Sequence, residues 1–367
     1  MKMESFKVVT KDLVKSCYIH IPFCKSICTY CDFCKMYYNE EFVKQYLKAL
    51  EKEVNSYYEQ EVLDTLYIGG GTPSCLSFNN LYELFEIIKR LDLSPLGEFT
   101  FECNVEDITL EFLQFLKSKG VNRLSIGVES FNDEFLELLG REYRAKDIRK
   151  KILLAKKYFT NINIDLIFGI KGQTLNDIKA DLKEFISLDI PHLSIYSLIL
   201  EDNTKLKIVG YEEISDDESR EMYDYIVSFL KKYNYIHYEI SNFSKDGYFS
   251  KHNLTYWNNN HYYGFGLGAS GYFNNVRYTN TRSITNYIKG NYRYEQVDIT
   301  KRIDEENFMI LGLRKTKGIS EEEFYNRYQE ELEEVFDVSK LEYKDGYYYI
   351  KEEYLYISNY ILQDFVS

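Results

Sequence analysis

Apolar runs of strand length alternate with segments of helical periodicity over the first two-thirds of the chain. Six runs resemble buried strands, at residues 17–21, 65–70, 98–103, 123–128, 162–169 and 192–198. A helical pattern follows each run, at 41–57, 79–91, 110–119, 145–158, 175–188 and 216–233. Because parallel strands need crossover helices, this order predicts a parallel sheet in an α/β fold. An open doubly wound sheet and a partial or full (β/α) barrel both fit the spacing.

The alternation ends near residue 237. Residues 237–300 are rich in Asn, Gly, Tyr and Ser, and their aromatic content predicts loops and short strands rather than disorder. Helices are expected at 305–314, 321–329 and 332–338, before two short strands joined at Asp345-Gly346, a strong hairpin signal. Helices followed by a hairpin resemble a winged helix. We expect a core in 1–240, a connecting segment in 241–300 and a small α+β domain in 301–367.

Charge and hydropathy exclude several classes of protein. The net charge of −13 argues against general binding to nucleic acid or anionic membranes, which requires clustered Lys and Arg. No run of about 18 apolar residues predicts a membrane span. The first residues lack the apolar stretch of a signal peptide, so we expect a cytoplasmic protein.

Seven cysteines are present, and five of them fall between positions 17 and 34. An odd, crowded set is typical of metal binding rather than of a disulfide framework. Cys24, Cys28 and Cys31 follow the first predicted strand with C-x3-C-x2-C spacing. A structural zinc site usually has four ligands in two pairs, and no second pair follows. A four-iron cluster held by only three cysteines keeps one iron open for an exchangeable ligand.

Gly69-Gly70-Gly71-Thr72-Pro73 follows the second predicted strand directly. Consecutive glycines allow a ligand to approach the backbone and expose amide groups, although a tight turn would use them equally well. The position at a strand end, on the face where barrel sites lie, favours a ligand. The run does not match the G-x-G-x-x-G pattern of dinucleotide binding.

Single charged residues lie at or near the ends of the later strands. Glu102 and Glu129 end their strands, and Asp165 interrupts the apolar run INIDLIFG. A buried Asp is costly unless it is paired, and a ribose hydroxyl or a ligand ammonium group would be a suitable partner. Arg141 could neutralise a carboxylate. For each residue alone, a structural ion pair is an equally good explanation.

A further motif, His252-Asn253-Leu254-Thr255-Tyr256-Trp257, lies in the segment without regular pattern. His252 is chemically competent as an axial haem ligand, and the two aromatic residues could line a flat apolar ring. The alternative is a loop histidine beside core aromatics.

The segment from Tyr18 to Cys24, the C-x3-C-x2-C run and Asp32-Phe33 resemble the radical S-adenosylmethionine (SAM) superfamily. Within it they are similar to the coproporphyrinogen dehydrogenase and haem-chaperone family (HemN and HemW), over nearly the whole chain. The resemblance implies an incomplete (β/α)6 barrel with a smaller C-terminal domain. It also implies a 4Fe–4S cluster on the three cysteines and SAM at the open iron.

The resemblance further implies cofactor contacts at Tyr18, Tyr30, Gly70, Gly71, Thr72, Glu102, Glu129, Arg141 and Asp165. The motif at His252 matches the H-N-x-x-Y-W motif that the chaperone branch carries and that is linked there to haem binding. The chain departs from the family at Glu129, where Gln is usual, and at Ser270, where His is frequent. An ionised Glu cannot donate a hydrogen bond, so Glu129 would change the cofactor contacts.

Three functions remain open by this resemblance: a haem chaperone, a coproporphyrinogen dehydrogenase, and another radical enzyme acting on tetrapyrroles. The dehydrogenase branch places a fourth cysteine two residues after the third ligand. Phe33 occupies that position here, and Cys34 follows one residue later. We therefore favour the chaperone, with haem as cargo, an acceptor protein of unknown identity, and an electron donor such as flavodoxin or ferredoxin. Whether the chain is also an enzyme stays open.

Overall fold

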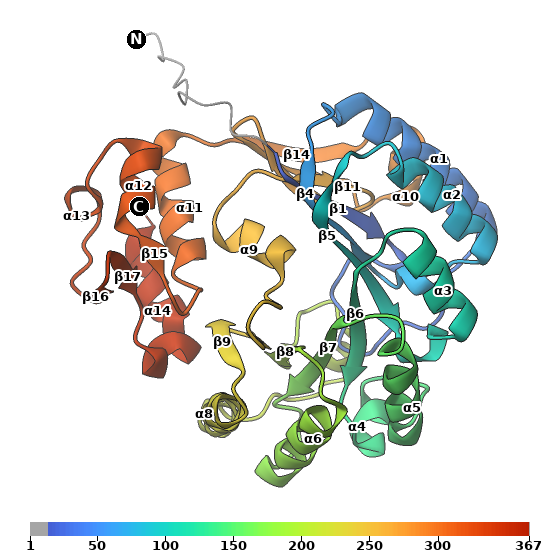
Figure 1. The fold of residues 1–367 in the computed structure, drawn as a ribbon, viewed down its shortest axis with the longest axis horizontal. Coiled ribbons are helices and arrows are strands. Elements are labelled where there is room, and N and C mark those ends of the chain that lie inside the picture. Colours follow the sequence, from blue (N-terminus) through green and yellow to red (C-terminus); the bar gives the residue numbers. More distant parts are fainter. Residues whose placement is uncertain (1–13, 367) are drawn as a thin grey trace.

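The structure is a computed structural model and describes residues 14–366. Six parallel strands form the centre of the sheet (Figure 1): β1 (Ser16–Ile21), β4 (Leu63–Gly70), β5 (Leu93–Asn104), β6 (Arg123–Glu129), β7 (Asn161–Phe168) and β8 (His192–Ser197). They lie side by side in chain order. A doubly wound sheet would reverse its order at a switch point, and none occurs among these six strands. The fold is therefore the partial (β/α)6 barrel that the resemblance implied.

Helices cover the outer face of this sheet (Figure 1): α1 (Glu40–Tyr57), α2 (Phe78–Ile88), α3 (Leu110–Ser118), α4 (Asp133–Leu138), α5 (Ala145–Ala155), α6 (Leu175–Leu188) and α8 (Asp216–Lys232). All six predicted helices are present, with ends within three residues of the predicted ones. Side-chain oxygens cap several first turns, for example Thr109 on α3 and Ser215 on α8. None of the helices within residues 14–366 is long and apolar enough to cross a membrane.

The expected connecting segment, 241–300, and the residues just before it complete both edges of the sheet. β11 (Tyr263–Phe265) pairs in parallel with β1, while β10 (Asn242–Ser244) and β9 (Ile236–Glu239) extend the edge beyond β8 in antiparallel orientation. The segment also forms a small sheet of β12 (Ser270–Phe273), β13 (Val276–Asn280) and β14 (Arg293–Asp298), with α10 (Ile284–Ile288) between its last two strands. Its aromatic side chains share one hydrophobic core with the barrel. The division of the chain at residues 240 and 300 stays a prediction.

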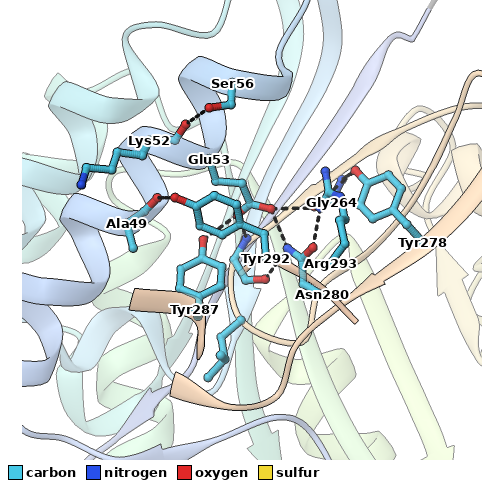
Figure 2. A network of polar contacts seen from close by, with 12 residues as sticks. Ala49, Lys52, Glu53, Ser56, Gly264, Tyr278, Asn280, Tyr287, Tyr292 and Arg293 are labelled. Carbon is cyan, nitrogen blue, oxygen red and sulfur yellow. Dashed lines mark hydrogen bonds and ion pairs between the residues drawn. The ribbon is translucent and has the colours of Figure 1, made fainter. Parts of the chain in front are cut away.

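A buried carboxylate attaches this segment to the barrel helix α1 (Figure 2). Glu53 accepts a hydrogen bond from the side chain of Asn280 at 2.7 Å. It accepts another from the amide of Gly266 at 2.8 Å. It also accepts from the hydroxyl of Tyr287 at 2.5 Å and pairs with Arg293 at 3.0 Å. Every oxygen of this fully buried carboxylate is thus satisfied, as a buried charge requires.

Helix α9 (Lys251–Trp257) packs against the barrel strands through hydrogen bonds to β1 and β5. Its first amides, those of Lys251 and His252, donate to the carboxylate of Glu98 at 3.2 and 3.1 Å. Ser16, at the start of β1, hydrogen-bonds Thr255 at 2.7 Å. Ser16 is the first residue of β1, and the register of the sheet aligns it with Thr65 of β4 and Glu98 of β5. The helix therefore lies at the end of the barrel opposite the usual catalytic face.

The last residues form a small body of their own beside the barrel (Figure 1). It has a separate hydrophobic core. In chain order it contains α11 (Lys301–Gly312), β15 (Ile319–Ser320), α12 (Glu321–Tyr328), α13 (Leu332–Val335), β16 (Glu342–Lys344), β17 (Tyr347–Tyr349) and α14 (Ser358–Leu362). Both Asp345 and Gly346 have positive φ, 52° and 81°, as a two-residue type I′ hairpin requires. The winged-helix-like arrangement and its hairpin are therefore confirmed.

Candidate functional site

The three cysteines lie on a loop whose two ends are joined by a pair of short strands, β2 (Phe23–Cys24) and β3 (Met36–Tyr37). Beside this pair, the amide of Tyr38 donates to the carbonyl of Cys24 at 2.8 Å. Midway along the loop, the hydroxyl of Thr29 donates to a carbonyl in segment 138–139 at 2.8 Å, and its carbonyl accepts from an amide of α7 (Lys205–Ile208). The loop therefore has a defined shape from contacts of the chain alone.

Cys24, Cys28 and Cys31 line one cavity of about 500 Å³, and all three are free thiols. Within residues 14–366, no three His, Cys, Asp or Glu side chains converge closely enough to hold a single metal ion. The ligands of a four-iron cluster bind three different irons, so they surround a volume rather than a point. The donor set and the cavity fit a cluster better than a mononuclear zinc site.

The thiols must lose their protons to bind metal. Burial raises the pKa of each thiol, to about 11 for Cys24. The charge of the Arg141 guanidinium acts in the opposite direction on all three. Metal ligation supplies the remaining free energy of deprotonation, so cluster binding releases protons.

The glycine run is packed tightly against the cysteine loop and the next strand. A Cβ at Gly71 would lie 2.8 Å from the Sγ of Cys24. A Cβ at Gly69 would lie 2.8 Å from the carboxylate of Glu102. Backbone atoms of segment 22–23 also lie within 3.0 Å of a Cβ at Gly71, so glycine is required there, whereas a Cβ at Gly69 would need only a shift of the Glu102 side chain.

The amides of this run differ from the expectation that they are free for a ligand. The amide of Gly70 donates to Glu102 at 3.0 Å. Those of Gly71 and Thr72 donate to carbonyls in segment 21–23, at 2.9 Å each. The run continues the pairing of β4 with the end of β1, which consumes these donors. Gly70, Gly71 and Thr72 nevertheless line the cavity, where the remaining backbone and the Thr72 hydroxyl can meet a ligand.

Glu129 and Arg141 form a buried ion pair on the wall of the cavity. The guanidinium also donates to the hydroxyl of Tyr30 at 3.0 Å and to the side chain of Asn104 at 3.1 Å. Glu129 has a left-handed backbone with φ 67°, next to a bulge in the β6–β7 pairing. Such backbone strain in a residue other than glycine is concentrated at functional sites. The carboxylate that Arg141 neutralises is thus one of the chain's own.

Glu102 and Asp165 also line the cavity, deeper in the barrel. Burial raises the pKa of Glu102 to about 7 and that of Asp165 to about 6. Glu102 accepts from the hydroxyl of Tyr67 at 2.7 Å, and Asp165 accepts from Asn163 at 2.8 Å. Near neutral pH each group can therefore exchange a proton and act as a donor or an acceptor.

Tyr18 is not among the described residues that line the cavity. Its ring lies beside that of Tyr67, with centroids 6.0 Å apart, and Tyr67 does reach the wall. The Tyr18 hydroxyl lies 2.9 Å from Nδ1 of His20. In this conformation Tyr18 supports the wall from behind.

His252 is buried, and both of its ring nitrogens have partners. Nδ1 lies 2.7 Å from the hydroxyl of Thr65, and Nε2 lies 2.8 Å from the hydroxyl of Tyr256. Burial lowers the pKa of the imidazole to about 3, so the ring is neutral, which is the form that binds iron. The motif expected in a loop is instead the helix α9, and in this conformation it offers no free imidazole nitrogen.

The sequence analysis did not single out the polar side chains inside the barrel. The cavity wall includes Arg123, Ser125, Asn163 and Ser194, all buried. Most barrels fill this volume with branched apolar side chains. The available signal was the alternation of polar residues in strands 123–128 and 162–169, which places one polar set on one face.

The side chains of Phe33 and Cys34 lie in different environments, one at the cavity and the other against Gly268. Phe33 is 69% exposed and lines the cavity, whereas Cys34 is not among the described lining residues. Cys34 packs against Gly268, where a Cβ would lie 2.8 Å from its Sγ. The fourth cysteine is therefore displaced from the cluster cavity, as its altered spacing suggested.

Comparison with known proteins agrees with this geometry. Residues 18–185 match the radical SAM superfamily. The chain is 41% identical over 330 residues to the haem chaperone HemW of Lactococcus lactis, with 88% of this chain and 87% of the relative covered. It is 42% identical over 338 residues to HemW of Bacillus subtilis, covering 88% and 89% of the two chains.

Among solved structures, coproporphyrinogen III oxidase (HemN) of Escherichia coli, described as a radical SAM enzyme, has a TM-score of 0.84. It covers 97% of this chain and 91% of its own, at 20% identity. This likeness supports the whole architecture, including the small C-terminal domain. Given the extent and level of identity with its relatives, the chain belongs to the HemW family of the radical SAM superfamily.

Proposed function

We propose that the chain is a haem chaperone that binds a 4Fe–4S cluster, SAM and haem, and passes haem to an acceptor protein. Its HemW relatives, similar along most of the chain, support this function. The observation that carries the choice of branch is the pair of positions after the third ligand. Phe33 lines the cavity where a dehydrogenase would have cysteine, and Cys34 packs elsewhere.

The proposed cluster ligands are Cys24, Cys28 and Cys31. When bound, the cluster supplies an open iron for SAM and an electron for its sulfonium. The chain supplies a preformed loop, a cavity and the positive charge of Arg141. That charge stabilises thiolates and any negatively charged group placed among them.

The proposed SAM contacts surround the same cavity. Gly70, Gly71 and Thr72 form the wall next to Cys24 and suit the methionine part of SAM. Asp165 suits a ribose hydroxyl, because a carboxylate deep in the barrel can accept from it. Tyr30, Glu102, Glu129 and Arg141 complete the polar wall, and Tyr18 holds Tyr67 in place behind it.

The proposed axial ligand of haem is His252. Because Nε2 faces Tyr256 and Nδ1 faces Thr65, one of these hydrogen bonds must open before iron can bind. The hydrogen bond to Tyr256 is the one that opens, because the phenol can rotate away without moving β4. We propose that the Tyr256 side chain rotates, or that α9 partly unwinds, when haem binds.

Oxidative decarboxylation of coproporphyrinogen is the second candidate. The observation in its favour is the architecture shared with HemN over nearly the whole chain. The 20% identity supports the fold alone, and the position of Cys34 argues against that activity. Other radical chemistry on a tetrapyrrole would use the same cavity.

The deciding experiment separates these functions. Protein reconstituted with iron and sulfide under anaerobic conditions is incubated with coproporphyrinogen, SAM and a reductant, and separately titrated with haem. A chaperone yields saturable haem binding and no protoporphyrinogen. Turnover to protoporphyrinogen would replace the proposal by the dehydrogenase.

The proposed partners are haem, an acceptor haem protein, and a one-electron donor such as flavodoxin or ferredoxin. We propose a cytoplasmic location, because closely spaced free thiols persist in a reducing compartment. The net charge of −13 makes nucleic acid an unfavourable partner.

A further inference from the structure

Arg123 is a buried cation inside the barrel. Its side chain belongs to the first residue of β6 and is 2% exposed. Its Nε has no hydrogen-bond partner within residues 14–366, and none of the ion pairs in that part of the chain includes it. A buried guanidinium without a contact partner is costly, so an unpaired Arg indicates a missing acceptor.

The missing acceptor has access to Arg123 through the cavity of the cysteines. Arg123 lines that cavity together with Ser125 and Asn163. The side chains of these two neighbours hydrogen-bond each other and Asp165, so they fix the shape of the wall beside the guanidinium. The cation is therefore aimed into a space that a ligand can enter.

The two carboxylates nearby do not replace this acceptor. Glu102 has its contacts with Tyr67 and the amide of Gly70, and Asp165 has its contacts with Asn163 and Ser125. Both feel the charge of Arg123 without touching it. Since burial raises their pKa values, each is partly protonated near neutral pH and can donate a hydrogen bond to an incoming anion.

We propose that Arg123 anchors a carboxylate of the tetrapyrrole cargo in the deep part of the cavity. The inference rests on the proposed function and adds the group that recognises a propionate arm. A guanidinium binds a carboxylate through two parallel hydrogen bonds, with strength and defined orientation. Asn253 of α9 lines the same cavity, and the charge of Arg123 acts on His252, so the anchor lies on the side of the cavity that carries the proposed axial ligand.

The competing explanation is that Arg123 is a structural cation, kept only to balance Glu102 and Asp165 at a distance. In that case neutralising it would leave the half-buried carboxylates of Glu102 and Asp165 uncompensated and lower the melting temperature of the ligand-free protein. A ligand anchor behaves differently. Its removal relieves an unpaired charge, so the melting temperature stays level or rises.

The test compares haem with haem dimethyl ester, whose propionates carry no charge. Both ligands are titrated into reconstituted wild type, Arg123→Gln, Arg123→Lys and the surface control Arg90→Gln. We expect esterification to weaken binding to wild type by about 10- to 100-fold, the range for a charge-assisted contact. Arg123→Gln should lose affinity for haem by a similar factor and no longer distinguish the ester. Arg123→Lys should retain part of the preference, and Arg90→Gln all of it.

Each outcome bears on one idea. Binding of neither ligand to wild type would refute the proposed haem function. Equal binding of both ligands to wild type would overturn the anchor while leaving haem binding intact, and this measurement needs no variant. If Arg123→Gln still binds haem more tightly than haem dimethyl ester, the haem carboxylate binds at a site other than Arg123. A large fall in the melting temperature of ligand-free Arg123→Gln would favour the structural cation.

Discussion

The hydroxyl of Tyr256 lies 2.8 Å from Nε2 of His252, four residues earlier on the same helix. The opposite nitrogen lies 2.7 Å from the hydroxyl of Thr65 on β4. Through Nδ1 the imidazole thus connects α9 to the barrel strand β4. Through Nε2 it contacts Tyr256 within α9 itself. Ligation of iron by Nε2 competes directly with the hydrogen bond to Tyr256.

Removing the hydroxyl of Tyr256 should strengthen haem binding. In Tyr256→Phe the Nε2 of His252 loses its partner, and a buried polar group without a partner costs about 1–3 kcal/mol. We expect the ligand-free variant to be destabilised by that order and haem to bind more tightly, because iron replaces the lost contact. Urea unfolding and Soret titrations measure the two effects. His252→Ala is the companion variant, in which the spectrum of bound haem should change. Weaker haem binding by Tyr256→Phe would contradict this mechanism.

The cluster should depend on three cysteines and tolerate loss of the fourth. We expect Cys24→Ala, Cys28→Ala and Cys31→Ala each to abolish a four-iron cluster after anaerobic reconstitution. Cys34→Ala is the matched control and should retain it, because Cys34 packs against Gly268 away from the cavity. Iron and sulfide content with electron paramagnetic resonance of the reduced protein provides the measurement. A normal cluster in Cys28→Ala would refute the assignment.

Glu129→Gln should reveal the cost of the buried pair. The substitution keeps the shape of the side chain and leaves Arg141 without its countercharge. Hydrogen bonds to charged groups contribute about 1.5–3 kcal/mol, so we expect a loss of that order in the free energy of unfolding. SAM should bind more tightly, since Arg141 becomes free to meet its carboxylate.

The exposed pair of Glu137 with Arg144 provides the control for this prediction. Glu137→Gln should change stability by less than about 1 kcal/mol, as exposed pairs do. Urea unfolding without ligand and calorimetric titration with SAM measure both variants. Unchanged stability in Glu129→Gln would show that the pair contributes nothing net.

The raised pKa of Glu102 predicts a pH effect of definite sign. Its ordinary value of 4.5 rises to about 7 because the carboxyl is buried, so the folded state binds a proton more tightly than the unfolded state. This contribution to stability is complete below about pH 4.5 and lost as the pH rises through 7. The free energy of unfolding of Glu102→Gln should equal that of the wild type at pH 4.5. At pH 8 it should be larger, by an amount on the order of 3 kcal/mol.

The measurement that tests this prediction is the difference in the free energy of unfolding between wild type and Glu102→Gln at each pH. Burial lowers the pKa of His20 to about 4 and that of His252 to about 3, so these residues favour the folded state increasingly as the pH rises toward 6.5. Their effect opposes that of Glu102 in the same interval and cancels on subtraction. Parallel stability curves for the two proteins from pH 4.5 to 8 would contradict the assigned shift.

The network at Glu53 should control the attachment of segment 263–293. Glu53→Ala leaves Arg293 and several donors without their acceptor (Figure 2), and breaking a buried pair costs about 3–5 kcal/mol. Amide hydrogen exchange should accelerate in that segment. Glu51→Ala, which removes an exposed partner of Arg90, is the control and should have little effect. Equal exchange in both variants would show that the aromatic core holds the segment alone.

The strand–helix order was predictable because each element carries its own periodicity. The six parallel strands and their helices follow from apolar runs and amphipathic spacing, and Asp345-Gly346 from its need for positive φ. The cysteines could be identified because three thiols at this spacing serve few purposes. These signals are local, so no partner elsewhere in the chain is needed to interpret them.

The remaining features depend on contacts between distant residues. β11 has only three residues, Tyr263–Phe265, and becomes a strand by pairing with β1. α9 is short and rich in poor helix formers, and the carboxylate of Glu98, 153 and 154 residues away, caps its first turn. The occupied nitrogens of His252 are likewise invisible in the motif, because Thr65 lies on another element.

The closed shape of the cysteine loop has a consequence for how iron arrives. In small zinc domains the metal must also provide the free energy that orders its ligands. Here the β2–β3 pair and the contacts of Thr29 have already restricted the loop, so little chain entropy remains to be lost on loading. Cluster insertion should then leave the conformation of the loop nearly unchanged. Apoprotein would survive repeated damage by oxygen and be reloaded without refolding.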